Sequence, residues 1–348
     1  MTNQMRIGLC VPQGYFNEYD GWDPVKAWKR TLEVSELGAR LGFESIWTGE
    51  HVTSKWGGHA STAFDVWVMT TAIAALVPDA EIGFSVVNST FHNPALTAKM
   101  AGTLDVIANG RVVLGLGAGF RQIEADTFGF PYPTLGERLA MLGEHFEIVT
   151  RALNHDEPPF SFEGKHAWVK DIDNAPRGVR RPRVKIMVAG RGPKVTFPLA
   201  AKYADIFNLG VETPELPEML ALFRATCERL GRDPDTIELQ GGLNPGVAYK
   251  GQTQFYGQRM MGLHERAFTD PEVMAKLGSR VDEIQKWAEA GCDEFVVTPP
   301  GLHNSDESLY ELVEEIREAG IEFPRAGWGP RAHEPKAPYR PASGSPGR

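Results

Sequence analysis

The strongest constraint on the fold of this 348-residue chain is a regular alternation between short β-rich runs and longer helical patterns. Such alternation is typical of a parallel sheet with helices outside it. Eight β-then-α units follow one another, which predicts an α/β fold closed into a (β/α)₈ TIM barrel with insertion segments. The expected strands are residues 6–11, 44–47, 81–87, 111–116, 184–188, 206–209, 236–241 and 294–297. The expected helices are residues 25–41, 64–76, 94–107, 135–153, 194–203, 216–230, 280–290 and 308–319.

Two segments interrupt the alternation of strands and helices, and a third follows the last expected helix. Residues 155–182 are rich in proline, glycine and charge, which predicts an excursion across the surface. Residues 244–272 carry tyrosine, phenylalanine and methionine in a glycine- and glutamine-rich setting, and loops of this length are often functional. We expect one barrel domain over residues 1–330 and a disordered tail over residues 331–348, whose composition cannot bury a core.

Charge and cysteine content exclude several classes of function. The formal net charge is −9, which argues against nucleic-acid binding, since that needs a basic face. The three cysteines lie far apart and show no metal spacing, so we expect a reducing, cytoplasmic location and no bound metal. There is neither a signal-peptide apolar region at the start nor an apolar run long enough to span a membrane, so we expect no membrane partner.

In a (β/α)₈ barrel the active-site residues follow the carboxyl ends of the strands. His51 directly follows the second expected strand, and imidazole can donate or accept a proton near neutral pH. We therefore interpret His51 as the candidate catalytic residue; alternatively, it packs at the rim of the barrel. Substrate-pocket candidates near these strand ends are Phe16, Trp56, Phe84 and Phe120. They favour a mostly apolar or aromatic small molecule, although Trp56 could equally anchor its own loop.

The fifth strand leads into a turn that suits an anion. Gly190, Arg191, Gly192 and Pro193 end a strand and open a helix, where free N–H groups and the helix dipole face outward. The glycines permit close approach of a phosphate, and Arg191 adds positive charge in an acidic protein. This pattern predicts a phosphate site, and the alternative is a plain strand-to-helix turn that needs glycine.

Several motifs in order resemble the bacterial luciferase-like family of flavin- and deazaflavin-dependent oxidoreductases. They are Trp-Thr-Gly-Glu-His at 47–51, the stretch 85–119 with Phe-His-Asn-Pro and Gly-Leu-Gly-Ala-Gly, and Gly-Arg-Gly-Pro at 190–193 followed by Ala-Asp at 204–205. The resemblance covers roughly residues 5–325 and is nearest the actinobacterial branch described as dependent on coenzyme F420. It implies that His51 lies beside the coenzyme's reactive face and that the chain forms a homodimer. The cofactor-binding residues that it implies are Ser85, Val86, Asn88, Gly117, Ala118 and the 190–193 turn, with a cis peptide between Ser85 and Val86.

The chain departs from its relatives at two positions after the fourth strand. Ala118 stands where luciferase proper has an arginine for the FMN phosphate, which counts against a luciferase-type phosphate clamp. Phe120 stands where the deazaflavin enzymes that oxidise a sugar phosphate have an acidic residue, which counts against that substrate. Phe120 instead suggests a more apolar pocket.

Four functional hypotheses follow. The first is F420-dependent hydride transfer to or from a small organic substrate, with His51 as proton donor or acceptor. The second is a two-component monooxygenase that uses O₂ and reduced FMN, the latter supplied by a separate reductase. The third is a non-catalytic flavin-binding barrel, against which the presence of His51 weighs. The fourth is a phosphate-binding barrel isomerase, which would not need the glycine-rich fourth strand exit. The fold alone does not choose among them.

Overall fold

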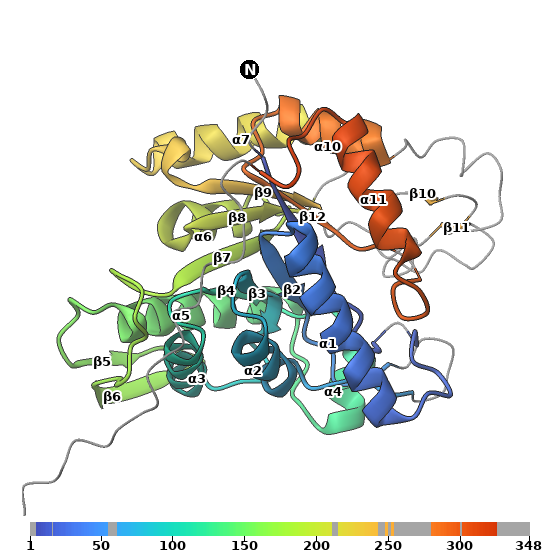
Figure 1. The fold of residues 1–348 in the computed structure, drawn as a ribbon. Helices are drawn as coiled ribbons and strands as arrows, with labels where there is room; N and C mark the ends of the chain where they lie inside the picture. The colour runs from blue at the N-terminus through green and yellow to red at the C-terminus, as the bar shows by residue number, and fades with distance from the viewer. Residues whose placement is uncertain are drawn as a thin grey trace, which may run out of the picture.

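The computed structural model describes residues 5–15, 17–54, 61–210, 215–242, 248–249, 252–253, 280–299 and 301–325. Eight parallel strands close into a barrel in the order β1-β12-β9-β8-β7-β4-β3-β2, with helices around it (Figure 1). The predicted (β/α)₈ barrel is confirmed. Its strands are β1 (Arg6–Cys10), β2 (Ser45–Thr48), β3 (Glu81–Asn88), β4 (Val112–Gly117), β7 (Lys185–Gly190), β8 (Ile206–Leu209), β9 (Glu238–Gly242) and β12 (Glu294–Val297).

The helices begin where the sequence places capping residues. Asp23 accepts a hydrogen bond from Lys26 N at the start of α1, and Asn93 does the same for two N–H groups at the start of α3. Thr134 and Glu137 form a reciprocal capping box at the start of α5. The outer helices are α1 (Pro24–Leu41), α2 (Val66–Leu76), α3 (Pro94–Ile107), α5 (Leu135–Leu153), α6 (Thr196–Tyr203), α7 (Leu216–Arg229), α10 (Arg280–Glu289) and α11 (Glu307–Glu318).

The structure adds elements that the sequence pattern did not predict. A short helix, α4 (Gln122–Phe128), follows β4 and precedes α5. The excursion 155–182 contains an antiparallel hairpin of β5 (Phe160–Glu163) and β6 (Trp168–Ile172). Of the second insertion, 244–272, the structure describes only β10 (Ala248–Tyr249) and β11 (Gln252–Thr253), and the tail 331–348 lies outside the described residues.

The interior of the barrel is filled by side chains. Trp47 of β2 is fully buried there, and glycines on the adjacent strands leave room for its ring. A Cβ atom at Gly83 would lie 2.2 Å from that ring, and one at Gly8 would lie 2.8 Å from the indole nitrogen. A compact apolar cluster therefore occupies the middle of the barrel, formed by Cys10, Trp47, Val113, Met187, Ile206 and Val296.

Charged side chains close the amino end of the barrel. Arg6, at the start of β1, lies 2.8 Å from Glu81 of β3 and also pairs with Glu238 of β9. Lys185 of β7 lies 2.6 Å from Glu238. Deeper inside, the buried Glu294 carboxylate accepts a hydrogen bond of 2.6 Å from Gln240 Nε2. These contacts link the first residues of several strands, so the end opposite the strand exits is held shut.

Candidate functional site

A pocket of about 250 Å³, open to solvent, lies at the carboxyl ends of β2, β3, β4 and β7. This volume lies just below the range typical of small-molecule sites, about 300–1,000 Å³. The pocket brings together half of the candidate site residues expected from the sequence, His51 among them. It is lined by Glu50, His51, Ser85, Val86, Asn88, Gly117, Ala118, Gly119, Phe120, Arg121, Glu124 and Ala189.

His51 is held on the pocket wall by rings on two sides and a carboxylate. Its ring centroid lies 4.7 Å from that of Tyr15 and 5.7 Å from that of Phe120. The Nδ1 atom lies 3.1 Å from each carboxylate oxygen of Glu124. The Glu124 side chain is only 3% exposed, and its Oε1 also accepts a hydrogen bond from Val52 N at 3.1 Å. The orientation of the imidazole is therefore fixed.

Arg121 completes this cluster. Its Nη1 donates to Glu124 Oε1 and to the Thr53 carbonyl, both at 3.1 Å. Burial lowers the pKa of the Arg121 guanidinium, and Glu124 opposes that effect. Sequence reasoning missed Arg121 and Glu124 because it missed α4. The available signal was an arginine and a glutamate three residues apart, directly after the glycine-rich exit of β4.

The Ser85–Val86 peptide bond is cis, as the family resemblance implied. At this point the pairing of β3 with β4 shifts register, between Phe84 and Val87. Gly117 of β4 lies directly against Val86, since a Cβ atom at Gly117 would come within 2.5 Å of Val86 Cγ2. Glycine at 117 thus allows β3 and β4 to form a closely packed wall beneath the pocket.

Glu50 lies behind the same wall and organises the exit of β3. Its Oε2 accepts a hydrogen bond of 2.6 Å from Asn88 N, and its Oε1 lies 2.6 Å from His92 Nε2. The Asn88 side chain accepts from Thr90 N at 3.0 Å and packs under Gly119, where a Cβ atom would come within 2.4 Å of it. Glu50 also lines the pocket.

The turn after β7 adjoins the pocket through Ala189. Gly190 has a φ of 138°, and α6 begins later than expected, at Thr196, without a side-chain cap. Arg191 is exposed, and its Nη2 lies 2.9 Å from Glu215 Oε1, next to the start of α7. The turn therefore presents backbone groups and a cation that is partly neutralised. Phosphate binding by Gly190, Arg191, Gly192 and Pro193 stays a prediction.

The expected substrate-pocket residues are distributed differently. Phe120 lines the pocket and is 47% exposed. Phe84 does not line it: the side chain is fully buried, with its ring centroid 4.6 Å from that of Trp67 in α2. The reason is strand alternation, because Gly83 and Ser85 face the barrel interior while Phe84 faces the helices. Phe16 and Trp56 lie outside the described residues.

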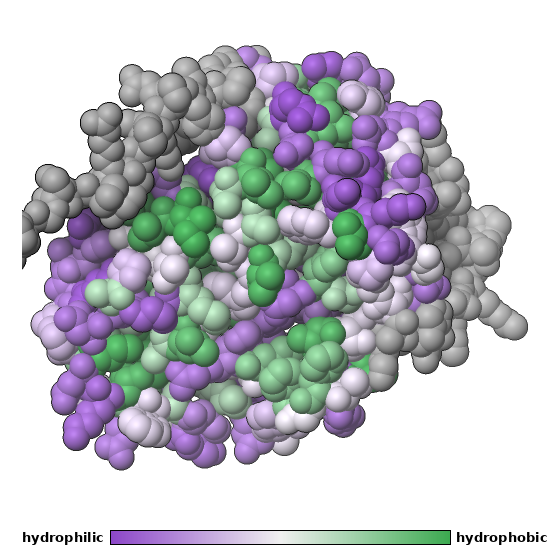
Figure 2. Space-filling model, turned by 60° about the horizontal axis from the view of Figure 1, so that its bottom comes forward, coloured by the Kyte–Doolittle hydropathy of each residue, from purple (hydrophilic) through white to green (hydrophobic). Residues whose placement is uncertain are grey.

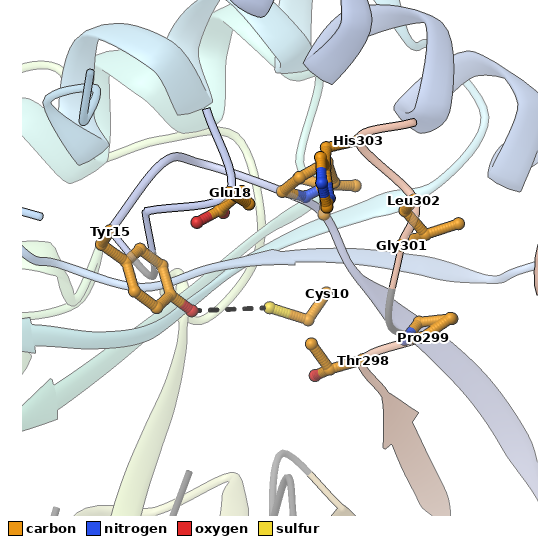
Figure 3. A pocket seen from close by; sticks show the side chains of 10 residues that line it. Cys10, Tyr15, Glu18, Thr298, Pro299, Gly301, Leu302 and His303 are labelled. Carbon is orange, nitrogen blue, oxygen red and sulfur yellow. Dashed lines mark hydrogen bonds between the residues drawn. The ribbon is translucent and has the colours of Figure 1, made fainter. Parts of the chain in front are cut away.

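A second, much smaller hollow of about 30 Å³ lies beside the ends of β1 and β12 (Figure 3). Cys10, Tyr15, Glu18, Thr298 and His303 lie around it, and Tyr15 Oη is 4.0 Å from Cys10 Sγ. Burial raises the pKa of the Cys10 thiol to about 11, so this thiol stays protonated at neutral pH. The Tyr15 ring, which lines this hollow, also packs against His51 of the larger pocket.

Among the described residues, no three His, Cys, Asp or Glu side chains are placed to hold a metal ion. Among the same residues, no helix has both the length and the apolar character required to cross a bilayer.

Comparison with known proteins agrees with this geometry. Residues 5–250 match the family described as "Luciferase-like monooxygenase". An F420-dependent glucose-6-phosphate dehydrogenase from Kineococcus radiotolerans is 32% identical over 334 residues, which cover 86% of this chain and 94% of that protein.

Two solved structures share the fold at lower identity. An F420-dependent secondary alcohol dehydrogenase in complex with an F420-acetone adduct is 20% identical, with a TM-score of 0.68. The monooxygenase RslO1 from Streptomyces bottropensis is 21% identical, with a TM-score of 0.69. Each comparison covers 90% of this chain and 99% of the other. The family match extends over most of the chain, and the chain belongs to the luciferase-like monooxygenase family.

Proposed function

We propose that this protein is an F420-dependent oxidoreductase that transfers a hydride to or from a small organic substrate in the His51 pocket. The observation that carries the proposal is the combination of a fixed histidine with a glycine-rich wall at the carboxyl end of the barrel. The name of the Kineococcus relative supports the choice of coenzyme, because the alignment covers nearly all of that protein.

The pocket residues fit a flat ring system. Gly117 and Ala118 carry no side chain larger than a methyl group, and the Ser85–Val86 backbone forms the adjoining wall. The turn at residues 190–193 would hold the phosphate of the coenzyme, because Ala189 connects it to the pocket. When bound, reduced F420 supplies a hydride from C5 and does not readily activate oxygen.

His51 balances the proton in this reaction. Addition of hydride to a C=O, C=N or C=C bond leaves an anion that must gain one proton, and the reverse reaction must lose one. In this proposal, His51 gives the proton in reduction and takes it in oxidation. Phe120, half-exposed at the pocket wall, favours a substrate with an apolar part.

A second candidate is an FMN-dependent monooxygenase that receives reduced FMN from a separate reductase. The family description supports this candidate. The fold of RslO1 matches this chain as closely as the fold of the F420-dependent secondary alcohol dehydrogenase does. A third possibility, from another class, is a barrel that binds a flavin without catalysing a reaction.

Titration of the purified protein with F420 and with FMN, in both redox states, tests these alternatives. We expect F420 to bind at least about tenfold more tightly than FMN, a difference of roughly 1.4 kcal/mol. Reduced F420 should then be oxidised by one or more members of a panel of ketones, imines and activated alkenes. Tight FMN binding with consumption of O₂ would favour the monooxygenase. Binding without turnover across the panel would favour the non-catalytic barrel.

We also infer that the chain forms a homodimer, as the family resemblance implies. Apolar side chains gather on the face on which α2 and α3 lie (Figure 2). Val68 of α2 is 73% exposed, and Leu96 of α3 is 53% exposed. An apolar face of this kind is typical of an interaction surface. Sedimentation at the mass of a monomer would contradict the inference.

A further inference from the structure

The His51 imidazole contacts two buried side chains from α4, Arg121 at its start and Glu124 within it. The imidazole Nδ1 lies 3.1 Å from both oxygens of Glu124 and 3.4 Å from Nη1 of Arg121. The side chains of His51, Glu124 and Arg121 are 12%, 3% and 6% exposed. Because water is largely excluded, charge interactions among them are stronger than on the surface.

The geometry identifies which ring nitrogen carries hydrogen in the neutral form. An ionised carboxylate only accepts hydrogen bonds, and a guanidinium only donates them. Arg121 Nη1 already donates to Glu124 Oε1 and the Thr53 carbonyl at 3.1 Å. Nδ1 is therefore the donor to Glu124, and Nε2 is the nitrogen left to exchange a proton with the pocket.

The two neighbours act on the imidazolium in opposite directions. The Glu124 carboxylate stabilises a positive His51, whereas the adjacent Arg121 cation destabilises it. Among the described residues, the other titratable groups near His51 are Tyr15, whose ring packs on it, and Glu50, whose carboxylate is engaged by His92 and Asn88 N. In the part of the chain that the structure describes, the Glu124–Arg121 pair thus places two opposite charges in direct contact with His51.

We propose that Glu124 and Arg121 are positioning residues for His51. Glu124 fixes the Nδ1–H tautomer and turns Nε2 toward the pocket, and Arg121 holds the Glu124 carboxylate in place and offsets part of its charge. The proposal rests on the proposed function, in which His51 exchanges a proton with the substrate.

The test is an NMR titration of the imidazole ¹⁵N signals in the full-length protein, with His51→Asn used to assign the His51 resonances. Glu124→Gln removes the charge but keeps the shape, and it should lower the titration midpoint of His51 by about one pH unit. It should also increase the Nε2–H tautomer. Arg121→Gln should raise the midpoint. Opposite shifts are not expected from a merely structural role.

Matched controls come from the same part of the chain. Asp126→Asn changes one charge on an exposed position of α4 and should leave the His51 midpoint unchanged. Arg121→Lys keeps the cation and should restore the wild-type midpoint in part. Thermal unfolding of each variant shows whether the fold persists.

Turnover supplies the second readout. Glu124→Gln should lower kcat about tenfold, with the KM for coenzyme within about threefold, and should shift the pH–rate profile in the same direction as the NMR midpoint.

His51 titration midpoints that do not move, or that move in the same direction in Glu124→Gln and Arg121→Gln, overturn the proposal. If they move as expected but turnover is unchanged, the pairing stands and the proton role of His51 fails. If the His51 midpoints stay unchanged in both variants while His51→Asn abolishes turnover, the proposed function stands and the positioning role of Glu124 and Arg121 fails.

Discussion

His51 is the residue on which the proposed chemistry depends. Replacement by asparagine keeps a similar size and some hydrogen bonding to Glu124 but removes the titrating group. We expect kcat to fall about 10²-fold or more, because a positioned acid or base typically contributes about 10²–10⁴-fold. Coenzyme affinity should stay within about threefold, as measured by fluorescence titration.

The same variant separates the two enzymatic alternatives. In an F420-dependent enzyme it should slow oxidation of the reduced coenzyme without producing hydrogen peroxide. In a monooxygenase it should still consume reduced FMN but release hydrogen peroxide in place of product. Wild-type turnover with either coenzyme would remove His51 from the mechanism.

Single residues differed in how far the sequence could predict them. His51 was found because it directly follows a strand, and Val86 and Gly117 because the motifs around them resemble those of the luciferase-like family; all three line the pocket. Glu124 was missed because its role depends on a seven-residue helix, too short to show a clear period. Phe84 was misplaced because an aromatic residue before a strand exit does not reveal which way it faces, and only the register of β3 settles this.

At the scale of elements, the turn between β7 and α6 permits a test of coenzyme binding. The ion pair between Arg191 and Glu215 should compete with a bound phosphate for the guanidinium. Arg191→Glu is expected to weaken coenzyme binding by about 1–3 kcal/mol, the scale of a charge-assisted hydrogen bond. Glu215→Gln should have the opposite effect and strengthen it, most clearly at low salt.

Calorimetric titration of both variants with F420 provides the measurement. Arg224→Gln is a suitable control, because Arg224 is also exposed and forms an ion pair, with Asp235, away from the turn. Equal affinity in wild type, Arg191→Glu and Glu215→Gln would place the phosphate elsewhere.

Long elements were predictable, and short ones were not. Strands and long helices have an apolar period that repeats, so their existence was clear and their ends shifted by one or two residues. The β5–β6 hairpin was read as an irregular excursion, because its strands are four and five residues long and mostly exposed. Its register depends on pairing between the two strands, which one strand alone does not reveal.

Across the whole molecule, the charged amino end of the barrel should make stability depend on pH. Burial alone raises the pKa of Glu81, but Lys185, Arg6 and Arg180 outweigh it and hold that pKa below its usual range. A carboxyl group whose pKa is lower in the folded state than in the unfolded state stabilises the fold at pH values above its unfolded-state pKa, near 4.3. This stabilisation is lost as the pH falls through the folded-state pKa. Glu81→Gln should therefore lower the free energy of unfolding by about 1–3 kcal/mol at pH 7.

Urea unfolding at several pH values measures this effect. The difference between wild type and Glu81→Gln should shrink steadily as the pH falls below about 4.3. Glu163→Gln in the exposed part of the hairpin is a control with the same change of charge and should differ little from wild type. A difference that stays constant from pH 7 to pH 3 would mean that Glu81 acts through packing alone.

The sealed amino end also has a kinetic consequence. With the barrel interior filled by Trp47 and its neighbours, coenzyme and substrate must use the same entrance at the strand exits. If the ring lies against the wall of Val86 and Gly117, it occupies the deeper position and must arrive first and depart last. Steady-state inhibition should then show oxidised coenzyme competing only with reduced coenzyme, and the organic product acting as a mixed inhibitor against both reactants. Because the filled barrel has one entrance, the coenzyme must bind before the substrate and leave after the organic product in each catalytic cycle.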